Sequence, residues 1–591
     1  MSEQPKSESS SAGDHSLLIR IREALQRRTA WASKILLLPE GQLFLLLAVV
    51  IGLFSGLAVV CFRVTIEWIR ISLLGSSLAP AHSRLFLVPA AVGLVVAFLV
   101  TRFFPRARGS GVNQTKAAVY VFDGYVPFST VIGKFVTCAL AIGSGQSLGP
   151  EDPSLQMGAG MASALGRRLG FSREKLRLLA PVGAAGGLAA AFNAPISAVL
   201  FVIEEVIGTW SAGVLGAIVL AAVSSAVVMR WFLGNEPLFR VPAYSLAHPS
   251  ELLSYAVLGV AGGLCSLMFL KLIVYLRPKL SALPRWTHYV QPAVAGLLIG
   301  IMALWLPQVL GAGYPFVDQA LHDQFAWQIL LLLGLAKILS TTLSFVSGTP
   351  GGMFAPTLFI GAMIGGAVGG LEHHFFPHFG GSVGPFALVG MGTFFAGFLR
   401  VPITSVFMVV EASGNYSIVL PVMISNTIAY LISRRYQHVP LFDVLSSQDG
   451  MDLPSMEEQR EQTTLRVEDA MRPSKDLTLL AADTLARAAQ LAEVASEEMM
   501  LVSFPSGRWA GITREELRHY AAENSPETPL REVLPSFRLP LLHPDHSLEE
   551  ALRLLHGRPF LPVVSRANLQ RLEGVISLSY VLETYRKSAG D

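Results

Sequence analysis

Carboxylates inside apolar sequence are the residues of this chain best suited to chemistry. Glu151 stands in the turn Gly149-Pro150-Glu151-Asp152-Pro153, and Glu204 and Glu205 end the apolar run APISAVLFVIEE. An acid in such a segment is costly to bury, so it indicates a functional role by default. Glu204, and Glu411 at the matching position of a second segment, can instead cap helix ends. Glu151 differs, because its glycine- and proline-rich turn is a candidate for binding a small anion. A carboxylate in such a turn can compete with that anion.

Two glycine-rich turns that contain proline precede apolar helices, and they read SGQSLGPEDPSLQMGAG and SGTPGGMFAPTLFIGAM. Because proline is tolerated in the first helical turn, Pro153 and Pro356 predict helix starts. A helix N-terminus presents unpaired N–H groups and the positive end of the helix dipole. Two such ends that face each other in a bilayer would hold a small anion without a fixed cation. Gly109-Ser110-Gly111 is a third candidate, since glycines let backbone approach the hydroxyl closely.

The elements that carry these turns form an internal repeat. Lys134, Ser144-Gly145, Gly149, Pro153-Ser154-Leu155 and Gly158-Ala159 recur in order as Lys337, Ser347-Gly348, Gly352, Pro356-Thr357-Leu358 and Gly361-Ala362. With a slightly larger offset, Val182-Gly183, Ala189, Pro195-Ile196-Ser197 and Glu204 recur as Val389-Gly390, Ala396, Pro402-Ile403-Thr404 and Glu411. Ordered matches at Lys, Pro and Glu argue against chance similarity. Duplicated halves are typical of secondary transporters, and similarity alone leaves a parallel or an inverted arrangement open.

Composition places these repeats in a membrane. The chain has 591 residues, of which 52% are apolar and only 15% charged. These values argue against a disordered chain and an ordinary soluble enzyme. A net charge of +3 is too small to indicate a polyanionic partner such as nucleic acid. Three scattered cysteines suit neither a disulfide framework nor a zinc site.

Apolar runs long enough to cross a bilayer, many of them broken by glycine or proline, predict a polytopic membrane protein. They lie near residues 42–66, 85–104, 127–143, 174–207, 212–233, 251–276, 289–306, 326–346, 353–372, 384–412 and 417–433. Residues 1–38 form a polar tail whose basic cluster predicts a cytoplasmic N-terminus, without a cleavable signal. The membrane domain would span 39–445, followed by a linker over 446–464 and a soluble α/β region.

On these residues the chain resembles the CLC family of chloride channels and chloride/proton antiporters. The family signatures GSGIP, G(K/R)EGP and GxFxP correspond to Gly109-Ser110-Gly111-Val112-Asn113, Gly149-Pro150-Glu151-Asp152-Pro153 and Gly352-Met353-Phe354-Ala355-Pro356. The stretches AAFNAP at 190–195 and LFVIEE at 200–205 also match. The resemblance covers about 40–445.

The resemblance implies a homodimer with one anion pathway in each subunit. Its fold would be mostly α, a polytopic helical bundle with two inverted repeats and discontinuous helices. Chloride would be the transported ligand, with protons as the coupled ion and no certain cofactor. Glu151 would be the gating glutamate and Glu205 the internal proton-transfer glutamate. The implied anion-binding set is Gly109, Ser110, Gly111, the amides of Met353 and Phe354, Ala355 and Phe442.

This chain departs from the family pattern at three places that matter. Pro150 stands where Lys or Arg is usual, which removes a positive charge and a backbone donor near the outer anion site. Asp152 stands where Gly is usual and adds a negative charge there, so we expect weak outer anion binding. Phe442 stands where the family has a tyrosine, and one hydroxyl donor is therefore lost. Asn113 in place of proline is a milder change.

The C-terminal region resembles an α/β pair of CBS domains over 465–520 and 525–588. The two would end in Gly511–Leu517 and Gly574–Ser579. CBS pairs often bind adenine nucleotides, with an aspartate on the ribose, and here Glu516 and Tyr580 hold that place. Both a nucleotide site and a purely structural dimerising module stay open.

The function that we expect is chloride/proton antiport, with Glu151 and Glu205 as two titratable stations. A passive chloride channel of the same fold is the alternative, because Phe442 lacks the hydroxyl and the outer site is weakened. An intramembrane enzyme or a magnesium-type transporter is disfavoured, since the apolar spans offer no metal cluster and no nucleophile–base pair. Intact Gly-Ser-Gly and Gly-x-Phe-x-Pro elements disfavour fluoride, and nitrate stays open. We expect a non-enzymatic, multi-pass protein of the plasma (inner) membrane with both termini cytoplasmic.

Overall fold

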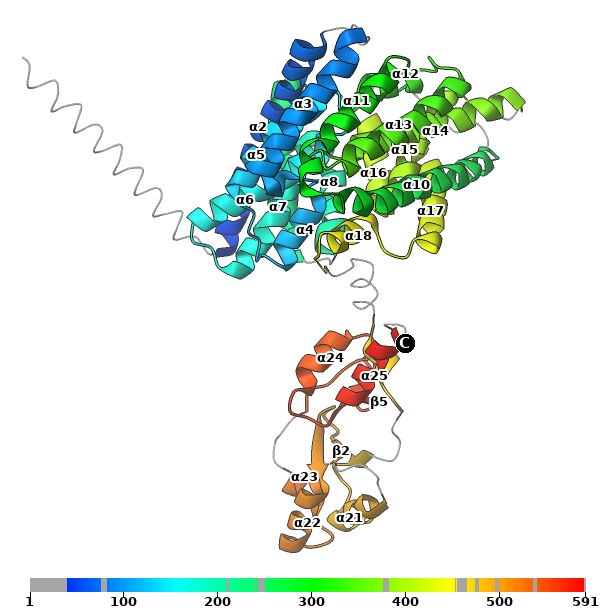
Figure 1. The fold of residues 1–591 in the computed structure, drawn as a ribbon. Coiled ribbons are helices and arrows are strands. Elements are labelled where there is room, and N and C mark those ends of the chain that lie inside the picture. Colours follow the sequence, from blue (N-terminus) through cyan, green and yellow to red (C-terminus); the bar gives the residue numbers. More distant parts are fainter. Residues whose placement is uncertain are drawn as a thin grey trace, which may run out of the picture. The chain divides into compact units, whose positions relative to one another are not determined.

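The computed structural model describes residues 40–75, 82–208, 212–239, 241–242, 250–375, 382–451, 453, 465–473, 478–494, 499–534 and 539–588. The chain divides into two compact units at Met456 (Figure 1). The predicted tail over 1–38 and most of the predicted linker over 446–464 lie outside the described residues.

The first half of the membrane unit is helical. Its helices are α2 (Glu40–Leu74), α3 (His82–Arg102), α4 (Val112–Tyr120), α5 (Phe128–Gly143), α6 (Glu151–Arg168), α7 (Arg173–Phe192), α8 (Pro195–Phe201) and α9 (Ala212–Leu233). A short 3-10 turn, η1 (Pro105–Ala107), precedes α4, and α8 continues into the π-helical segment η2 (Val202–Ile207).

The second half repeats this plan. It contains α10 (Glu251–Ser281), α11 (Gln291–Ala303), α12 (Tyr314–Leu321), α13 (Trp327–Val346), α14 (Phe354–Phe375), α15 (Val383–Leu399), α16 (Pro402–Ser413), α17 (Val419–Tyr436) and α18 (Leu441–Gln448). The short turns η3 (Arg285–Tyr289), η4 (Pro307–Val309) and η5 (Tyr416–Ile418) connect them. Within the described part of the chain, 8 helices are long and apolar enough to cross a membrane.

Two of the apolar runs are discontinuous helices. The run 174–207 breaks at Asn193, and the run 384–412 breaks at Arg400. Both residues adopt a left-handed conformation, with φ of 55° and 61°, and a proline begins the next helix two residues later. Proline fits the first helical turn but cannot continue the helix before it. The structure thus shows the discontinuous helices of the expected fold.

The helix pairs α6–α7 and α14–α15 approach closely through matching glycines. A Cβ added at Gly158 would lie 2.1 Å from the carbonyl oxygen of Gly183, and one added at Gly361 would lie 2.4 Å from that of Gly390. These are equivalent positions of the two repeats. Only glycine permits such close backbone contact. Because the contact is the same in both repeats, α6 packs on α7 in the same way as α14 packs on α15.

The C-terminal unit is α/β. A sheet of order β1-β2-β3 contains β1 (Thr478–Leu480), β2 (Met499–Ser503) and β3 (Trp509–Thr513), and β4 (Phe560–Val564) pairs antiparallel with β5 (Leu572–Ser577). The helices are α20 (Val467–Ala470), α21 (Leu485–Val494), α22 (Arg514–Glu523), α23 (Leu530–Val533), α24 (Leu548–Leu555) and α25 (Leu578–Ser588). Val467 packs in the core formed around β4 and β5, whereas Leu530 packs in the core of the first sheet. The two halves therefore exchange their N-terminal segments.

Candidate anion site

The turns before α6 and α14 are joined by a backbone bridge. The N–H of Gly149 donates to the carbonyl of Gly352, and the N–H of Gly352 donates to that of Gly149, both at 2.8 Å. Helix α6 begins at Glu151 and α14 begins at Phe354, so the predicted helix starts around Pro153 and Pro356 are confirmed. The bridge holds the N-termini of two helices from different repeats next to each other.

Glu151 lies in this junction with its side chain fully buried. Its Oε2 accepts a hydrogen bond from the backbone N–H of Ala355 at 3.3 Å. Its Oε1 is buried and has no hydrogen-bond partner among the described residues. A carboxylate from one repeat thus binds an amide at the N-terminus of the other repeat's helix, which is where a free anion would be favoured.

Asp152 makes a second contact of the same kind. Its Oδ2 accepts from the backbone N–H of Met353 at 2.9 Å, and the Ser110 hydroxyl and the Phe354 amide lie near this fully buried carboxyl group, whose Oδ1 has no hydrogen-bond partner among the described residues. The structure therefore brings the predicted anion donors Ser110, Met353 and Phe354 together, and it places the carboxylate of Asp152 among them. From the sequence we expected the charge of Asp152 to act near an outer site. Nothing in the sequence pattern shows which amides this side chain reaches.

The Gly109-Ser110-Gly111 loop adopts backbone conformations that favour glycine, with φ of 79° at Gly109 and 121° at Gly111. A Cβ at Gly111 would meet the carbonyl oxygen of Asp152 at 3.0 Å. The buried Lys134 donates to the carbonyls of Gly109 and Ser110 at 2.6 and 3.0 Å. The lysine contacts hold the loop against α5, and the close approach at Gly111 places the loop beside the start of α6.

The equivalent lysine of the second repeat makes similar contacts. Lys337 donates to the carbonyls of Val309 and Gly311 at 2.9 and 2.6 Å. The sequence identified Lys134 and Lys337 as a repeated pair without assigning them a role. In the structure each lysine binds two backbone carbonyls of the segment that precedes α4 or α12.

Phe442 is buried in the first turn of α18, a helix that contacts α4. The next residue, Asp443, forms a short hydrogen bond with Lys116 of α4. The Nζ of Lys116 also lies 3.6 Å from Oε1 of Glu205. All three charged side chains are buried, and one cation is shared by two acids. From the sequence, pairing with a nearby Lys or Arg was the structural alternative to a proton-transfer role for Glu205.

Glu204 and Glu411 cap helices of opposite repeats. Glu204 accepts from the backbone N–H of Thr404 at 2.8 Å and from its hydroxyl at 2.5 Å. Glu411 accepts from the backbone N–H of Ser197 at 2.7 Å and from its hydroxyl at 2.5 Å. The capping interpretation of these two acids is confirmed. The N-terminus of α8 and that of α16 are each hydrogen-bonded to a glutamate from the other half of the chain.

Glu516 and Tyr580 stand where a CBS pair would have its ribose-binding aspartate, and both contact other residues of the C-terminal unit. Glu516 accepts from the N–H and the hydroxyl of Thr513, both at 2.8 Å, in the capping box of α22. The guanidinium of Arg472 lies 4.2 Å from the centroid of the Tyr580 ring. In the described residues Glu516 thus stabilises a helix start.

Comparison with known proteins agrees with this architecture. The family model described as voltage-gated chloride channel matches residues 92–434, and the model of the CBS domain matches residues 530–587. A protein of Vibrio campbellii named H(+)/Cl(-) exchange transporter ClcA is 31% identical over 426 residues, which cover 69% of this chain and 90% of the relative. The protein of the same name from Vibrio cholerae is 32% identical over 418 residues, which cover 68% of this chain and 88% of the relative.

A solved structure described as a slow cyanobacterial Cl-/H+ antiporter superimposes with a TM-score of 0.63 and 25% identity, covering 70% of this chain and 98% of the other. More than half of the chain matches the family model. The discontinuous helices, and the capping of α16 by Glu204 and of α8 by Glu411, agree with two inverted repeats. The chain therefore belongs to the CLC family of voltage-gated chloride channels, as an integral multi-pass membrane protein with a C-terminal CBS pair.

Proposed function

We propose that this protein exchanges chloride for protons across the membrane. The observation that carries the proposal is the contact between Glu151 and the amide of Ala355. A helix N-terminus that binds a carboxylate can bind a chloride ion in its place. Because the carboxylate loses its charge on protonation, one proton gained and one anion bound become linked events at the same site. The relatives named as exchange transporters support this assignment.

Glu151 acts as the gate in this proposal. With its carboxylate on the Ala355 amide, it occupies the place of an anion and closes the path. Protonation weakens its hydrogen bond from the amide and removes its repulsion of chloride, so the side chain can leave and chloride can take its place. The return of the carboxylate expels the anion and releases the proton.

Asp152 adds a second tethered carboxylate at the neighbouring amide. Chloride that binds Ser110 and the amides of Met353 and Phe354 has to displace this side chain or meet it protonated. The anion site of the resting protein is therefore already filled by the protein's own charge. We infer slow turnover and a low apparent chloride affinity near neutral pH.

Glu205 supplies the second proton station. Its carboxylate lies beside the shared cation Lys116, and it belongs to the π-helical segment η2. Such segments leave the regular hydrogen-bond ladder and are frequent at functional sites. Protons would reach Glu151 from Glu205 by a route separate from the anion path, with water bridging the gap.

The alternative function is a passive chloride channel, and a specific observation favours it. The pairing of Glu205 with Lys116 can hold the fold without any proton transfer. Phe442 also offers no hydroxyl to the anion. In a channel, Glu151 would still gate the path, whereas Glu205 would move no protons.

The remaining assignments belong to the same proposal. The protein works as a homodimer with one anion pathway in each subunit, in the plasma (inner) membrane, with both termini in the cytoplasm. The CBS pair serves in dimerisation, and an adenine nucleotide is a candidate ligand for it. Labels at residues 10 and 455 should react from the same side of the membrane, and labelling from opposite sides would contradict this topology.

The proposed function is tested with purified protein in liposomes that carry a chloride gradient and no proton gradient. Wild-type protein should move protons uphill, driven by chloride. Glu205→Ala should still pass chloride but no longer drive protons. Wild-type protein that passes chloride and never moves protons would support the channel instead.

A further inference from the structure

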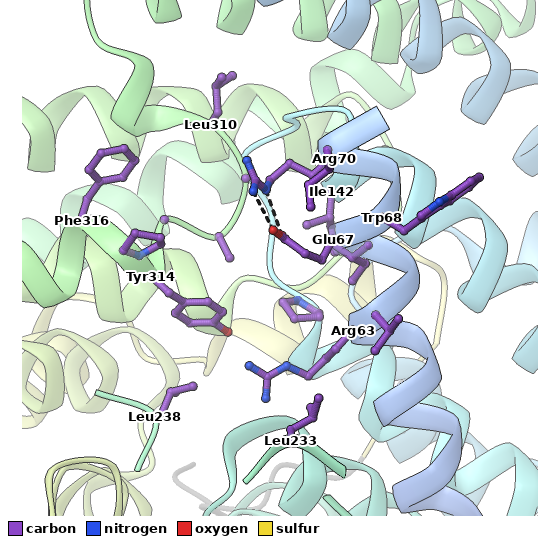
Figure 2. A pocket seen from close by; sticks show the side chains of 18 of the residues that line it. Arg63, Glu67, Trp68, Arg70, Ile142, Leu233, Leu238, Leu310, Tyr314 and Phe316 are labelled. Atoms are coloured by element: carbon purple, nitrogen blue, oxygen red, sulfur yellow. Dashed lines mark hydrogen bonds and ion pairs between the residues drawn. The ribbon is translucent and has the colours of Figure 1, made fainter. Parts of the chain in front are cut away.

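A cavity of about 790 Å³ lies between α2 and the Gly311–Phe316 segment that begins α12. Pro150, directly before the gating glutamate, is part of its wall. Figure 2 shows the guanidinium of Arg63 and the phenol of Tyr314 reaching into this space from the two sides. The cavity therefore connects the surroundings of Glu151 with two side chains that the anion site does not use.

Both side chains carry a buried donor without a partner. Neither Nη1 of Arg63 nor the hydroxyl of Tyr314 has a hydrogen-bond partner among the residues that the structure describes. Buried polar groups are almost always paired, so two unpaired donors in one cavity call for a ligand, an ion or water. A guanidinium has donors only, and a phenol hydroxyl donates readily, so the pair suits an anion.

The other charged groups around the cavity do not neutralise Arg63. Glu67 is paired with Arg70 through two hydrogen bonds of 2.6 and 2.9 Å. Glu236 also lines the cavity but is exposed to solvent. Arg63 and Glu151 attract each other electrostatically. An anion beside Arg63 would therefore compete with Glu151 for the same positive charge, in a cavity that Pro150 helps to line.

Backbone carbonyl oxygens near the cavity would repel an anion, but two of them already accept hydrogen bonds. The carbonyls of Val309 and Gly311 accept hydrogen bonds from Lys337. Pro150 has neither a positive side chain nor an N–H to donate, so this part of the wall offers an anion no donor of its own. Arg63 on α2 supplies the positive charge that this turn lacks.

We propose that Arg63 and Tyr314 form a binding site for a small monovalent anion, which holds chloride before it replaces the carboxylate of Glu151. This inference rests on the proposed function for the identity of the anion. It assigns a site to residues outside the family motifs. Since Arg63 and Tyr314 reach the cavity from different halves of the chain, the site forms only in the folded membrane unit.

The test measures how transport current depends on chloride in planar bilayers, with chloride varied on one side at a time. Arg63→Gln should raise the half-saturating chloride concentration about tenfold on one side of the membrane and leave the other side unchanged. Arg63→Lys should fall between this variant and the wild type. Tyr314→Phe removes one hydroxyl and should raise the same constant about threefold.

The matched control is the double variant Glu67→Gln/Arg70→Gln, which removes the paired charges from the same cavity without changing the net charge. Its half-saturating concentration should stay within about twofold of the wild type. If Arg63→Gln does not fold, as shown by gel filtration, Tyr314→Phe carries the test because it removes a single oxygen atom.

Unchanged chloride dependence in both Arg63→Gln and Tyr314→Phe would overturn the site, as would equal changes on both sides of the membrane. A changed pH dependence with an unchanged half-saturating concentration would mean that Arg63 acts on Glu151 alone, which also overturns it. Failure of the proposed function looks different, because wild-type protein would then carry chloride without moving protons.

Discussion

Gly149 and Gly352 bind each other through two reciprocal backbone hydrogen bonds of 2.8 Å, and they occupy equivalent positions of the two repeats. An antiparallel pair of equivalent residues maps onto itself under a two-fold rotation, so a pseudo-two-fold axis passes between them. The caps follow the same rule, because Glu204 binds Thr404 and Glu411 binds Ser197. The candidate anion site therefore lies where the two inverted halves meet, and both halves supply its residues.

Gly149→Ala should release the gate. A Cβ at this position would lie 2.4 Å from Oε2 of Glu151 and 2.8 Å from Cβ of Ala355. The carboxylate cannot keep its hydrogen bond from the Ala355 amide, so we expect chloride flux with little pH dependence. Gly41→Ala is the control, since nothing lies within 4 Å of its added Cβ. Equal pH dependence in Gly149→Ala and wild type, measured as chloride efflux from liposomes, would contradict this geometry.

Asp152→Asn should increase the apparent chloride affinity. The substitution keeps the shape of the side chain and removes the negative charge that accepts a hydrogen bond from the Met353 N–H. We expect the half-saturating chloride concentration to fall about tenfold at neutral pH, because an anion no longer competes with a carboxylate. Chloride titration of transport measures this directly. A concentration that stays the same or rises would show that Asp152 does not compete with the anion.

Glu151→Gln should separate chloride from protons. The amide side chain cannot carry a proton in and out, and it does not repel chloride. We expect chloride transport without coupled proton movement and with most of the pH dependence lost. Parallel recordings with a chloride electrode and a pH electrode provide the measurement. Continued proton pumping under a chloride gradient would exclude Glu151 as the gate.

Lys116→Met should destabilise the membrane unit strongly. The substitution leaves the buried acids Asp443 and Glu205 without their shared cation. Removal of one partner from a buried ion pair costs about 3–5 kcal/mol. Thermal unfolding in detergent should show a large fall in the midpoint, while Lys271→Met, at an exposed position of α10, should show almost none. Adding Asp443→Asn to Lys116→Met should restore part of the stability, and a Lys116→Met midpoint close to wild type would refute the shared pair.

Much of the fold follows from local sequence patterns. The repeat, the helix starts around Pro153 and Pro356 and the capping acids Glu204 and Glu411 each depend on short motifs whose physical meaning is local. Hydropathy alone joined 174–207 into one run, because it does not register the left-handed turn at Asn193 before Pro195. The proline two residues later was the available signal.

The parts of the candidate site that the sequence does not predict are contacts between segments far apart in the chain. The sequence indicated that Asp152 adds a charge, but its contact with the Met353 amide depends on how α6 and α14 meet. The pair of Lys116 with Asp443 joins α4 to α18, and no motif spans both. Arg63 lies outside every motif and becomes visible only as an unpaired donor in a cavity.

The reversal potential of the reconstituted wild-type protein tests the central claim most directly. Recordings use opposed gradients of chloride and pH across a planar bilayer. An exchanger couples the two ions, so its reversal potential should lie away from the chloride Nernst potential and should shift when only the pH gradient is changed. A reversal potential that stays at the chloride Nernst potential at every pH gradient would contradict chloride/proton exchange.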